Sequence, residues 1–281
     1  MSRDGSEFLS EFLTELGAVA VTLENGGPGE FYEAAFPQQP DWSEVDVSGL
    51  FDGSVDADAI VDEVQSVFTE CARCDVSTLQ DQDWERNWLS SFEPTRVSRD
   101  LWVCPSWLPP PDANAVNLIV DPGLAFGTGT HPTTALCLQW LDRNRPAGFH
   151  VVDVGCGSGI LAIAALKLGA VHAWGVDIDP RALTTSRENA KRNDVEDEYT
   201  ACKLDGMPDG FSVQLVMANI LASVLIELKE RLVSLVRSGG VILLTGILHD
   251  QAKDVQSNFA SCFEFRENRR DNWSLLIGKR R

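Results

Sequence analysis

The stretch at residues 151–161, Val-Val-Asp-Val-Gly-Cys-Gly-Ser-Gly-Ile-Leu, constrains the fold of this chain more than any other. Its apolar start indicates a buried strand that ends in Asp153, and the apolar run at 160–166 indicates a helix. Three alternating glycines, Gly155, Gly157 and Gly159, separate the two. Glycine adopts positive φ at no steric cost, and amides at the start of a helix attract nucleotide phosphates and other anions. The pattern therefore predicts an α/β fold with a nucleotide-type ligand at this turn.

The spacing of the glycines distinguishes between kinds of nucleotide site. A dinucleotide-binding turn follows G-x-G-x-x-G, which would place its third glycine at position 160, where this chain has Ile160. The pattern that remains is D-x-G-x-G-x-G. A second strand at 171–176 ends in Asp177, an acid placed to accept hydrogen bonds from ribose hydroxyls. The simpler alternative is a tight turn that only shapes an α/β core.

Length and composition bound the class of protein. A chain of 281 residues can form one large domain or two modest ones. No run approaches about 18 apolar residues and the first residues lack a signal-peptide segment, so we expect a soluble, cytoplasmic protein. Seven cysteines without a regular framework favour reduced thiols. Cys71 and Cys74 form a single C-x-x-C, with no second pair or histidine cluster, and we expect no metal site.

The net charge of −19 is concentrated in one part of the chain. Residues 1–120 contain 23 acidic and 5 basic residues, whereas residues 121–281 contain 19 and 18. The excess could serve solubility or adaptation to a salty cytoplasm, although such an adaptation should spread over the whole chain. The sharper hypothesis is that the N-terminal part binds a basic partner. The same charge argues against direct binding of nucleic acid by that part.

The N-terminal part alternates between helical and strand patterns. A helix with the cap Asp56 is expected to extend to about residue 68. The other expected elements are a helix at 6–16 and strands at 19–23, 31–36 and 74–79. This order is a split β-α-β arrangement that lacks its first strand. Residues 80–100 read as a linker, and the aromatic stripe of Trp84, Trp88 and Phe92 within it is expected to serve packing.

The remainder of the chain predicts a mostly parallel sheet with helices on both faces. Strands at 101–104 and 115–120 precede the loop 121–134, which contains several glycines and threonines and opens an apolar helix. After the glycine turn, strands are expected at 171–177, 199–203, 213–218, 240–245, 261–266 and 273–278. The last two lie close together in sequence and favour an antiparallel hairpin at the edge of the sheet.

Four motifs occur in order: residues 121–134 with G-T-G-T-H-P-T-T, the turn D-V-G-C-G-S-G, residues 175–180 and residues 217–221. With them the chain resembles a class I S-adenosylmethionine methyltransferase, and more narrowly the PrmA family, which methylates large-subunit ribosomal protein eleven. The resemblance covers most of the chain. It implies a ferredoxin-like substrate-recognition domain at 1–79, a flexible linker at 80–100 and a methyltransferase domain at 101–281. Family members usually open with a strand before the first helix, which this sequence does not show, so either the start is truncated or another segment takes the place of that strand.

The resemblance also assigns residues to the cofactor. S-adenosylmethionine would contact Thr134, Gly155, Gly157, Asp177 and Asn219, and the ribose would lie at Asp177. Asn219 would be catalytic, because its side-chain oxygen can accept hydrogen bonds from the attacking amine of a lysine or an N-terminus. The simpler alternative is that Asn219 caps the helix near Ala222.

Other roles and other functions stay open at this stage. His131 could accept a proton, and Phe126 or the linker tryptophans could stabilise a methylated cation. An NAD-dependent oxidoreductase would share the strand, the turn and the acid, but Ile160 argues against it. A small-molecule methyltransferase and a non-catalytic ribosome-associated adaptor are the remaining alternatives.

Overall fold

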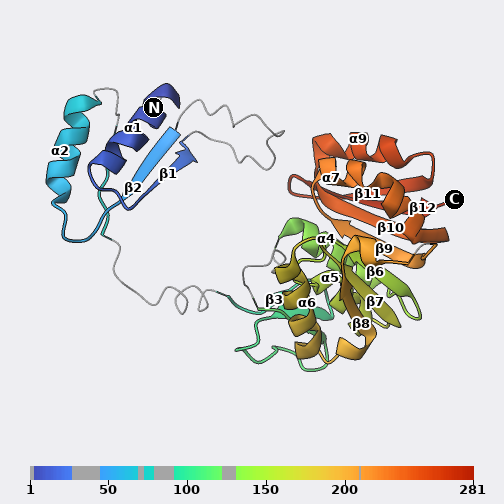
Figure 1. Cartoon of the computed structure of the whole chain (residues 1–281). Coiled ribbons are helices and arrows are strands. Elements are labelled where there is room, and N and C mark those ends of the chain that lie inside the picture. Colours follow the sequence, from blue (N-terminus) through green and yellow to red (C-terminus); the bar gives the residue numbers. More distant parts are fainter. Residues whose placement is uncertain (1–2, 27–44, 69–72, 79–91, 122–130, 209) are drawn as a thin grey trace. The chain divides into compact units, whose positions relative to one another are not determined.

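The computed structural model describes residues 3–26, 45–68, 73–78, 92–121, 131–208 and 210–281. The chain divides into two compact units, Met1–Gln82 and Asp83–Arg281, each of which is described by itself (Figure 1). In the described ranges no helix is both long and apolar enough to cross a membrane.

The described part of the N-terminal unit contains two helices and a two-stranded sheet. Helix α1 (Arg3–Glu15) is followed by strands β1 (Ala20–Asn25) and β2 (Val45–Leu50), which pair antiparallel, and by helix α2 (Ala57–Val67). The predicted cap is confirmed, because the Asp56 side chain accepts a hydrogen bond from the Ala59 amide. Apolar side chains of both helices, with that of the residue after α2, form a small core: Leu9, Leu13, Val64 and Phe68.

Of two further strands predicted in this unit, one cannot be compared with the structure and the other is wrong. The strand expected at 31–36 lies outside the described residues. The strand expected at 74–79 is wrong over residues 74–78, which form no strand. The apolar residues that suggested it do not share a buried face, since Val76 is 58% exposed. The partner of β1 is instead β2, a short segment that contains Ser48 and Gly49 and carries little apolar pattern.

The second unit is built on a seven-stranded sheet in the order β11-β12-β10-β9-β6-β7-β8. Its strands are β6 (His150–Val154), β7 (His172–Val176), β8 (Tyr199–Cys202), β9 (Val213–Asn219), β10 (Val236–Leu248), β11 (Phe263–Arg270) and β12 (Trp273–Arg280). Every pairing is parallel except those of β12, which runs antiparallel to β10 and to β11. The mostly parallel sheet and its terminal hairpin are thereby confirmed.

Helices cover both faces of this sheet, as the nearly continuous apolar strands require. Along β6, Val151 packs on one face and Val152 on the other. The Val151 face is covered by α4 (Pro132–Arg143), α5 (Ile160–Lys167) and α6 (Pro180–Arg192). The Val152 face is covered by α7 (Ala222–Glu227), α8 (Lys229–Leu235) and α9 (His249–Phe259). Two 3₁₀ turns, Glu196–Glu198 and Leu204–Gly206, flank β8.

A separate three-stranded sheet precedes α4. It contains β3 (Thr95–Arg96), β4 (Leu101–Cys104) and β5 (Val116–Ile119), with β3 antiparallel and β5 parallel to β4. Strand β3 falls inside the predicted linker 80–100, while the two compact units divide after Gln82. The domain boundaries at 79 and 100 stay a prediction.

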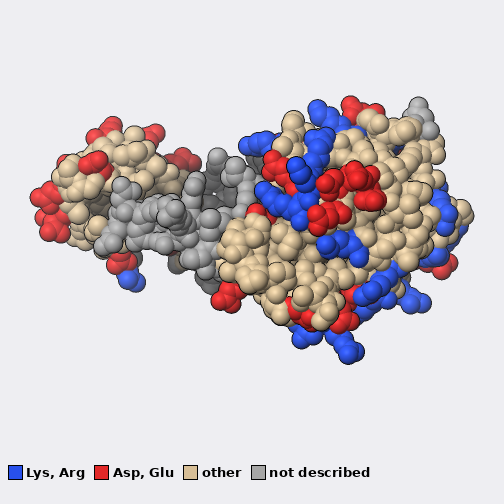
Figure 2. Space-filling model, turned by 90° about the horizontal axis from the view of Figure 1, so that it is seen from below, with Lys and Arg blue, Asp and Glu red and all other residues tan. Residues whose placement is uncertain are grey.

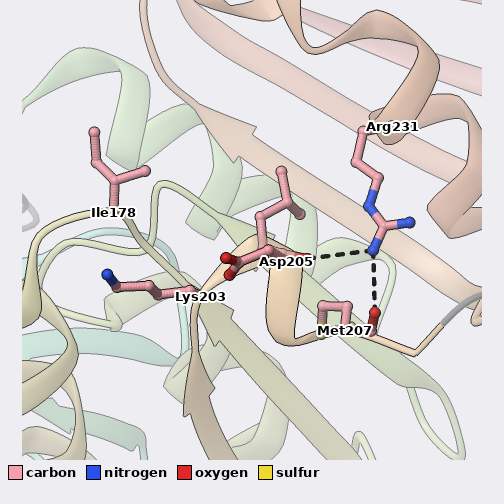
Figure 3. A pocket seen from close by; sticks show the side chains of 6 residues that line it. Ile178, Lys203, Asp205, Met207 and Arg231 are labelled. Carbon is pink, nitrogen blue, oxygen red and sulfur yellow. Dashed lines mark hydrogen bonds between the residues drawn. The ribbon is translucent and has the colours of Figure 1, made fainter.

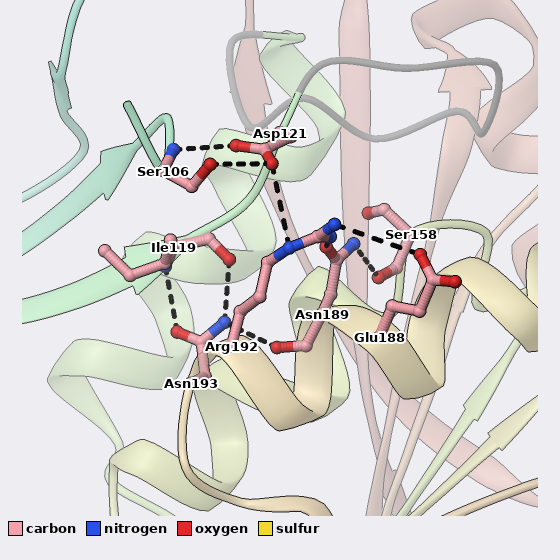
Figure 4. Close-up of polar contacts among 8 residues, drawn as sticks. All are labelled: Ser106, Ile119, Asp121, Ser158, Glu188, Asn189, Arg192 and Asn193. Atoms are coloured by element: carbon pink, nitrogen blue, oxygen red, sulfur yellow. Dashed lines mark hydrogen bonds and ion pairs between the residues drawn. The ribbon is translucent and has the colours of Figure 1, made fainter. Parts of the chain in front are cut away.

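One side chain joins this small sheet to the end of α6, the helix that packs on the large sheet. The Asn193 amide at the end of α6 accepts a hydrogen bond from the Ile119 amide (2.8 Å) and donates to the Ile119 carbonyl (2.7 Å) (Figure 4). Four residues earlier, Asn189 donates to the Ser158 carbonyl in the glycine turn (2.9 Å). Helix α6 therefore ties β5 and the glycine turn together.

We predict that Asn193→Ala destabilises the protein by roughly 2–3 kcal/mol, because it leaves both polar groups of Ile119 without their partner in a part-buried place. Chemical denaturation followed by circular dichroism measures the change. Asn268→Ala, on the exposed edge strand β11, is the matched control and should change stability by less than about 0.5 kcal/mol. Equal effects of the two substitutions would contradict the assignment.

Candidate functional site

The glycine turn requires glycine for backbone reasons. Gly155, Gly157 and Gly159 have φ of 73°, 52° and 78°, in the left-handed region that side chains disfavour. A Cβ at Gly155 would also lie 2.3 Å from the Ile220 side chain, and one at Gly159 would lie 2.9 Å from Cβ of Ser186. The turn therefore packs directly against the residue that follows Asn219, and the strand, turn and helix predicted from the sequence are confirmed.

Asp177 lies beside this turn at the carboxyl end of β7. One carboxylate oxygen accepts a hydrogen bond from the Gly157 amide and the other accepts one from the Asp179 amide, both at 3.0 Å. Asp179 in turn caps α6 by accepting from the Arg181 amide. Because a carboxylate oxygen can accept more than one hydrogen bond, the half-buried Asp177 is fixed in place and retains acceptor capacity.

A cavity of about 650 Å³ opens next to Asp177. Its lining is Ile178, Lys203, Leu204, Asp205, Met207 and Arg231 (Figure 3). Ile178 is 87% exposed, and Arg231 donates to the Leu204 and Met207 carbonyls, each at 3.2 Å, which fixes the connection between β8 and β9. Sequence reasoning missed this cavity. The sequence signals for it are Ile178, an apolar residue directly after Asp177, and Asp205, an acid three residues after the end of β8.

Asn219 ends β9 and contacts the start of α4. Its amide nitrogen donates to the Thr134 hydroxyl at 3.3 Å, and Thr134 is fully buried. Helix α7 has Leu221 as its N-cap with no side-chain hydrogen bond, so the alternative in which Asn219 caps this helix is wrong. Since the nitrogen is used toward Thr134, the oxygen of Asn219 is left as the acceptor.

His131 is the N-cap of α4. Its Nδ1 accepts a hydrogen bond from the Thr133 amide (3.4 Å) and lies 2.7 Å from the Thr133 hydroxyl. Burial lowers its pKa, so the ring is neutral at physiological pH and its proton lies on Nε2. The ring packs edge-on against Trp273 at 4.8 Å between centroids. Because the lone pair serves the helix, this geometry disfavours a role as proton acceptor. Phe126 lies outside the described residues.

Asp153, at the carboxyl end of β6, is buried beneath the turn with 1% exposure. One of its oxygens accepts a hydrogen bond from the Ala162 amide in the first turn of α5 (3.3 Å), where the cap residue Gly159 has no side chain to offer. In the described part of the protein the other oxygen has no partner. Burial raises the pKa of Asp153 to about 7, and the charge of Asp177 contributes in the same direction.

The predicted site residues thus meet in two contacts, Asn219 with Thr134 and Asp177 with Gly157. Gly155 joins the two contacts through its packing on Ile220. All of them lie at the carboxyl edge of the sheet, where α/β folds bind their ligands. Among the described residues no cluster of three or more metal-ligating side chains occurs.

Comparison with known proteins decides the family. The family model for ribosomal protein L11 methyltransferase (PrmA) matches residues 1–281. The chain belongs to this family. The L11 methyltransferase of Shewanella amazonensis is 42% identical over 283 residues, covering 100% of this chain and 96% of that protein. That of Sodalis glossinidius is 45% identical over 279 residues, covering 98% and 95%.

A solved structure agrees with this PrmA assignment. The crystal structure of ribosomal protein L11 methylase from Lactobacillus delbrueckii subsp. bulgaricus is 34% identical, has a TM-score of 0.62, and covers 68% of this chain and all of that chain. The predicted family, its methyltransferase activity toward ribosomal protein L11 and its cofactor S-adenosylmethionine are confirmed. The oxidoreductase alternative is thereby excluded. The ligand roles of Thr134, Gly155, Gly157, Asp177 and Asn219 stay predictions.

We predict that Gly155→Ala destabilises this PrmA protein by roughly 3 kcal/mol or more, because it combines left-handed strain with a collision against Ile220. Gly239→Ala is the matched control, since Gly239 has φ of 69° and open space around its missing Cβ. It should cost only the strain, about 1–2 kcal/mol. Equal losses in urea denaturation would show that the contact with Ile220 is dispensable.

Asp153 predicts a pH dependence of stability for the ligand-free protein. Its folded-state pKa of about 7 lies above its ordinary value of 3.8, so the folded state binds more protons between these values. The free energy of unfolding therefore falls as pH rises from about 4 to about 7. Asp153→Asn removes this dependence and should be more stable than the wild type above pH 7 by at least about 1 kcal/mol, given about 1.4 kcal/mol per pKa unit. Parallel pH profiles of the two proteins would refute this.

Proposed function

We propose that this PrmA protein transfers methyl groups from S-adenosylmethionine to amino groups of ribosomal protein L11, on lysine side chains, the N-terminal amine or both, and that Asn219 positions the amine. The observation that carries the proposal is the contact of Asn219 with Thr134 at the carboxyl edge of the sheet, beside the glycine turn. It leaves a fixed amide oxygen pointing away from the hydrogen bond that holds it.

The residues present fit the cofactor. The side-chain-free backbone of the turn at Gly155 and Gly157, the Asp177 carboxylate and the Thr134–Asn219 pair would hold S-adenosylmethionine, whose sulfonium supplies an electrophilic methyl group. The cavity beside Asp177 suits a planar base, because Ile178 offers an apolar surface and Asp205 an acceptor for an exocyclic amino group. This extends the predicted cofactor site by two residues.

The proposed chemistry needs positioning more than acid–base catalysis. The amine attacks as the neutral form, and the rate comes from aligning nitrogen, methyl and sulfur while excluding water. The Asn219 oxygen accepts one N–H of the amine and so directs its lone pair. His131, with its lone pair used by α4, maintains the start of this helix and hence the place of Thr134.

The acidic N-terminal unit is proposed to recognise L11, a basic protein of the ribosome. Exposed carboxylates lie on both helices, with Glu7, Glu11 and Glu15 one turn apart along α1. Figure 2 shows acidic side chains over the described part of this unit and a mixture of both signs over the second unit. We retain the predicted division into a recognition domain (1–79), a linker (80–100) and a catalytic domain (101–281), and a cytoplasmic location, as parts of this proposal.

We predict that Asn219→Ala lowers methyl transfer at least tenfold, which corresponds to about 1.4 kcal/mol of lost transition-state stabilisation. The melting temperature should fall only slightly, because Asn219 caps no helix and the variant loses a single hydrogen bond, the one to Thr134. Single-turnover methylation of L11 at saturating cofactor separates this effect from weaker cofactor binding. Full turnover by the variant would remove Asn219 from the mechanism.

We predict that replacing Glu7, Glu11 and Glu15 together by Gln raises KM for L11 several-fold and leaves kcat unchanged. The effect should shrink as salt rises, since the Debye length is about 8 Å at physiological ionic strength. Glu227, Glu230 and Asp250, exposed carboxylates of the second unit, replaced by their amides form the matched control. A KM equally raised in this control would show that only total charge matters.

A further inference from the structure

One feature of Asp153 is not used by the proposed mechanism. One carboxylate oxygen caps α5 through the Ala162 amide, while the other is buried and has no partner among the described residues. A buried polar atom without a partner costs free energy in the ligand-free protein. Capping of α5 accounts for only one of the two carboxylate oxygens. The oxygen of an uncharged side-chain amide would cap the helix as well, so capping does not require a carboxylate.

The titratable groups that interact electrostatically with Asp153 carry either no charge or negative charge. They come from four elements: Cys137 on α4, Cys156 in the glycine turn, Asp177 at the end of β7 and Tyr199 on β8. Burial raises the pKa of Cys137, Cys156 and Tyr199, which keeps all three neutral. In the described part of the chain no lysine or arginine forms an ion pair with Asp153 or Asp177. Two interacting carboxylates thus have no ion-paired cation in the described part of the chain, although Lys203 and Arg231 line the cavity beside Asp177. The ligand-free site favours a proton on the more buried carboxylate.

The proposed cofactor brings a positive charge to these two carboxylates. S-adenosylmethionine carries a sulfonium, an ammonium and a carboxylate, a net charge of +1. Once its methyl group has left, the sulfonium is a neutral sulfide and the net charge is zero. The two molecules have nearly the same shape, so charge is the property by which a site can tell them apart.

We propose that Asp153 is a charge-selective residue: it releases its proton to solvent when S-adenosylmethionine binds and takes a proton back when the neutral product remains. The inference rests on the proposed cofactor site. An ionised Asp153 attracts the cationic cofactor, whereas the product leaves the two carboxylates uncompensated and the proton returns from solvent. The site thereby favours substrate over product, which limits inhibition by the product.

The test measures proton release from the full chain. Isothermal titration with S-adenosylmethionine in buffers of different ionisation enthalpy should show release of close to one proton per site at about pH 6 and far less at about pH 8.5. S-adenosylhomocysteine should release clearly less at both. Binding without proton release would overturn the role of Asp153. Absence of any cofactor binding would instead overturn the proposed function.

Asp153→Asn assigns the proton to this residue, because Asn retains an oxygen for the Ala162 amide and cannot ionise. The variant should release no proton, and its preference for S-adenosylmethionine over S-adenosylhomocysteine should fall about tenfold, which is about 1.4 kcal/mol. Asp250→Asn, an exposed acid in the first turn of α9, is the matched control and should behave as wild type. An unchanged preference in Asp153→Asn would refute the proposal.

An infrared measurement on the wild type covers the case in which Asp153→Asn does not fold. The carbonyl band of a protonated buried carboxyl group should be present at about pH 6 and disappear when S-adenosylmethionine is added. It should persist with S-adenosylhomocysteine. A band that is absent without ligand, or that both ligands abolish equally, would contradict charge selection by Asp153.

Discussion

The close contact between Gly155 and Ile220 is the constraint on which the rest of the second unit depends. It joins the turn after β6 to the end of β9 with no room for a side chain between them. Through this contact the two central strands of the sheet end at one place. The neighbouring carboxylates, Asp153 below the turn and Asp177 beside it, then bond to turn and helix amides. A different residue at position 155 would disturb the strand ends, the helix start and both acids together.

The parallel sheet brings the residues of the site together around this contact. Parallel strands bring their carboxyl ends to one edge, so residues separated by up to 85 positions, such as Thr134 and Asn219, come into hydrogen-bond distance. Helix α6 adds a second connection, because it contacts the turn through Asn189 and the small sheet through Asn193. The polar residues of the site are therefore held by secondary structure on several sides, as positioning chemistry requires.

Much of this could be predicted from the sequence where the local signal agrees with the tertiary structure. The glycine turn, the cap Asp56, the mostly parallel sheet and the terminal hairpin all have signals within a few residues. Strand β2 and the non-strand at 74–78 were mispredicted because pairing partners and shared burial decide short segments, not local propensity. The cavity at Ile178 and Asp205 was missed because it forms only where two connections on neighbouring strands meet. The lone pair of His131 could not be assigned before its contact with Thr133 was known.

The double hydrogen bond between Asn193 and Ile119 has a consequence for solubility. Strand β5 lies at the edge of its sheet, and an open edge offers backbone donors and acceptors to other chains. The side-chain amide of Asn193 presents one donor and one acceptor in the same arrangement as a peptide group, and it occupies both backbone positions of Ile119. The Asn193 side chain thus makes the two hydrogen bonds that a neighbouring strand would make with Ile119. It thereby blocks edge-to-edge association at this point. Aspartate lacks the donor and leucine lacks both groups, so neither could seal the edge in this way.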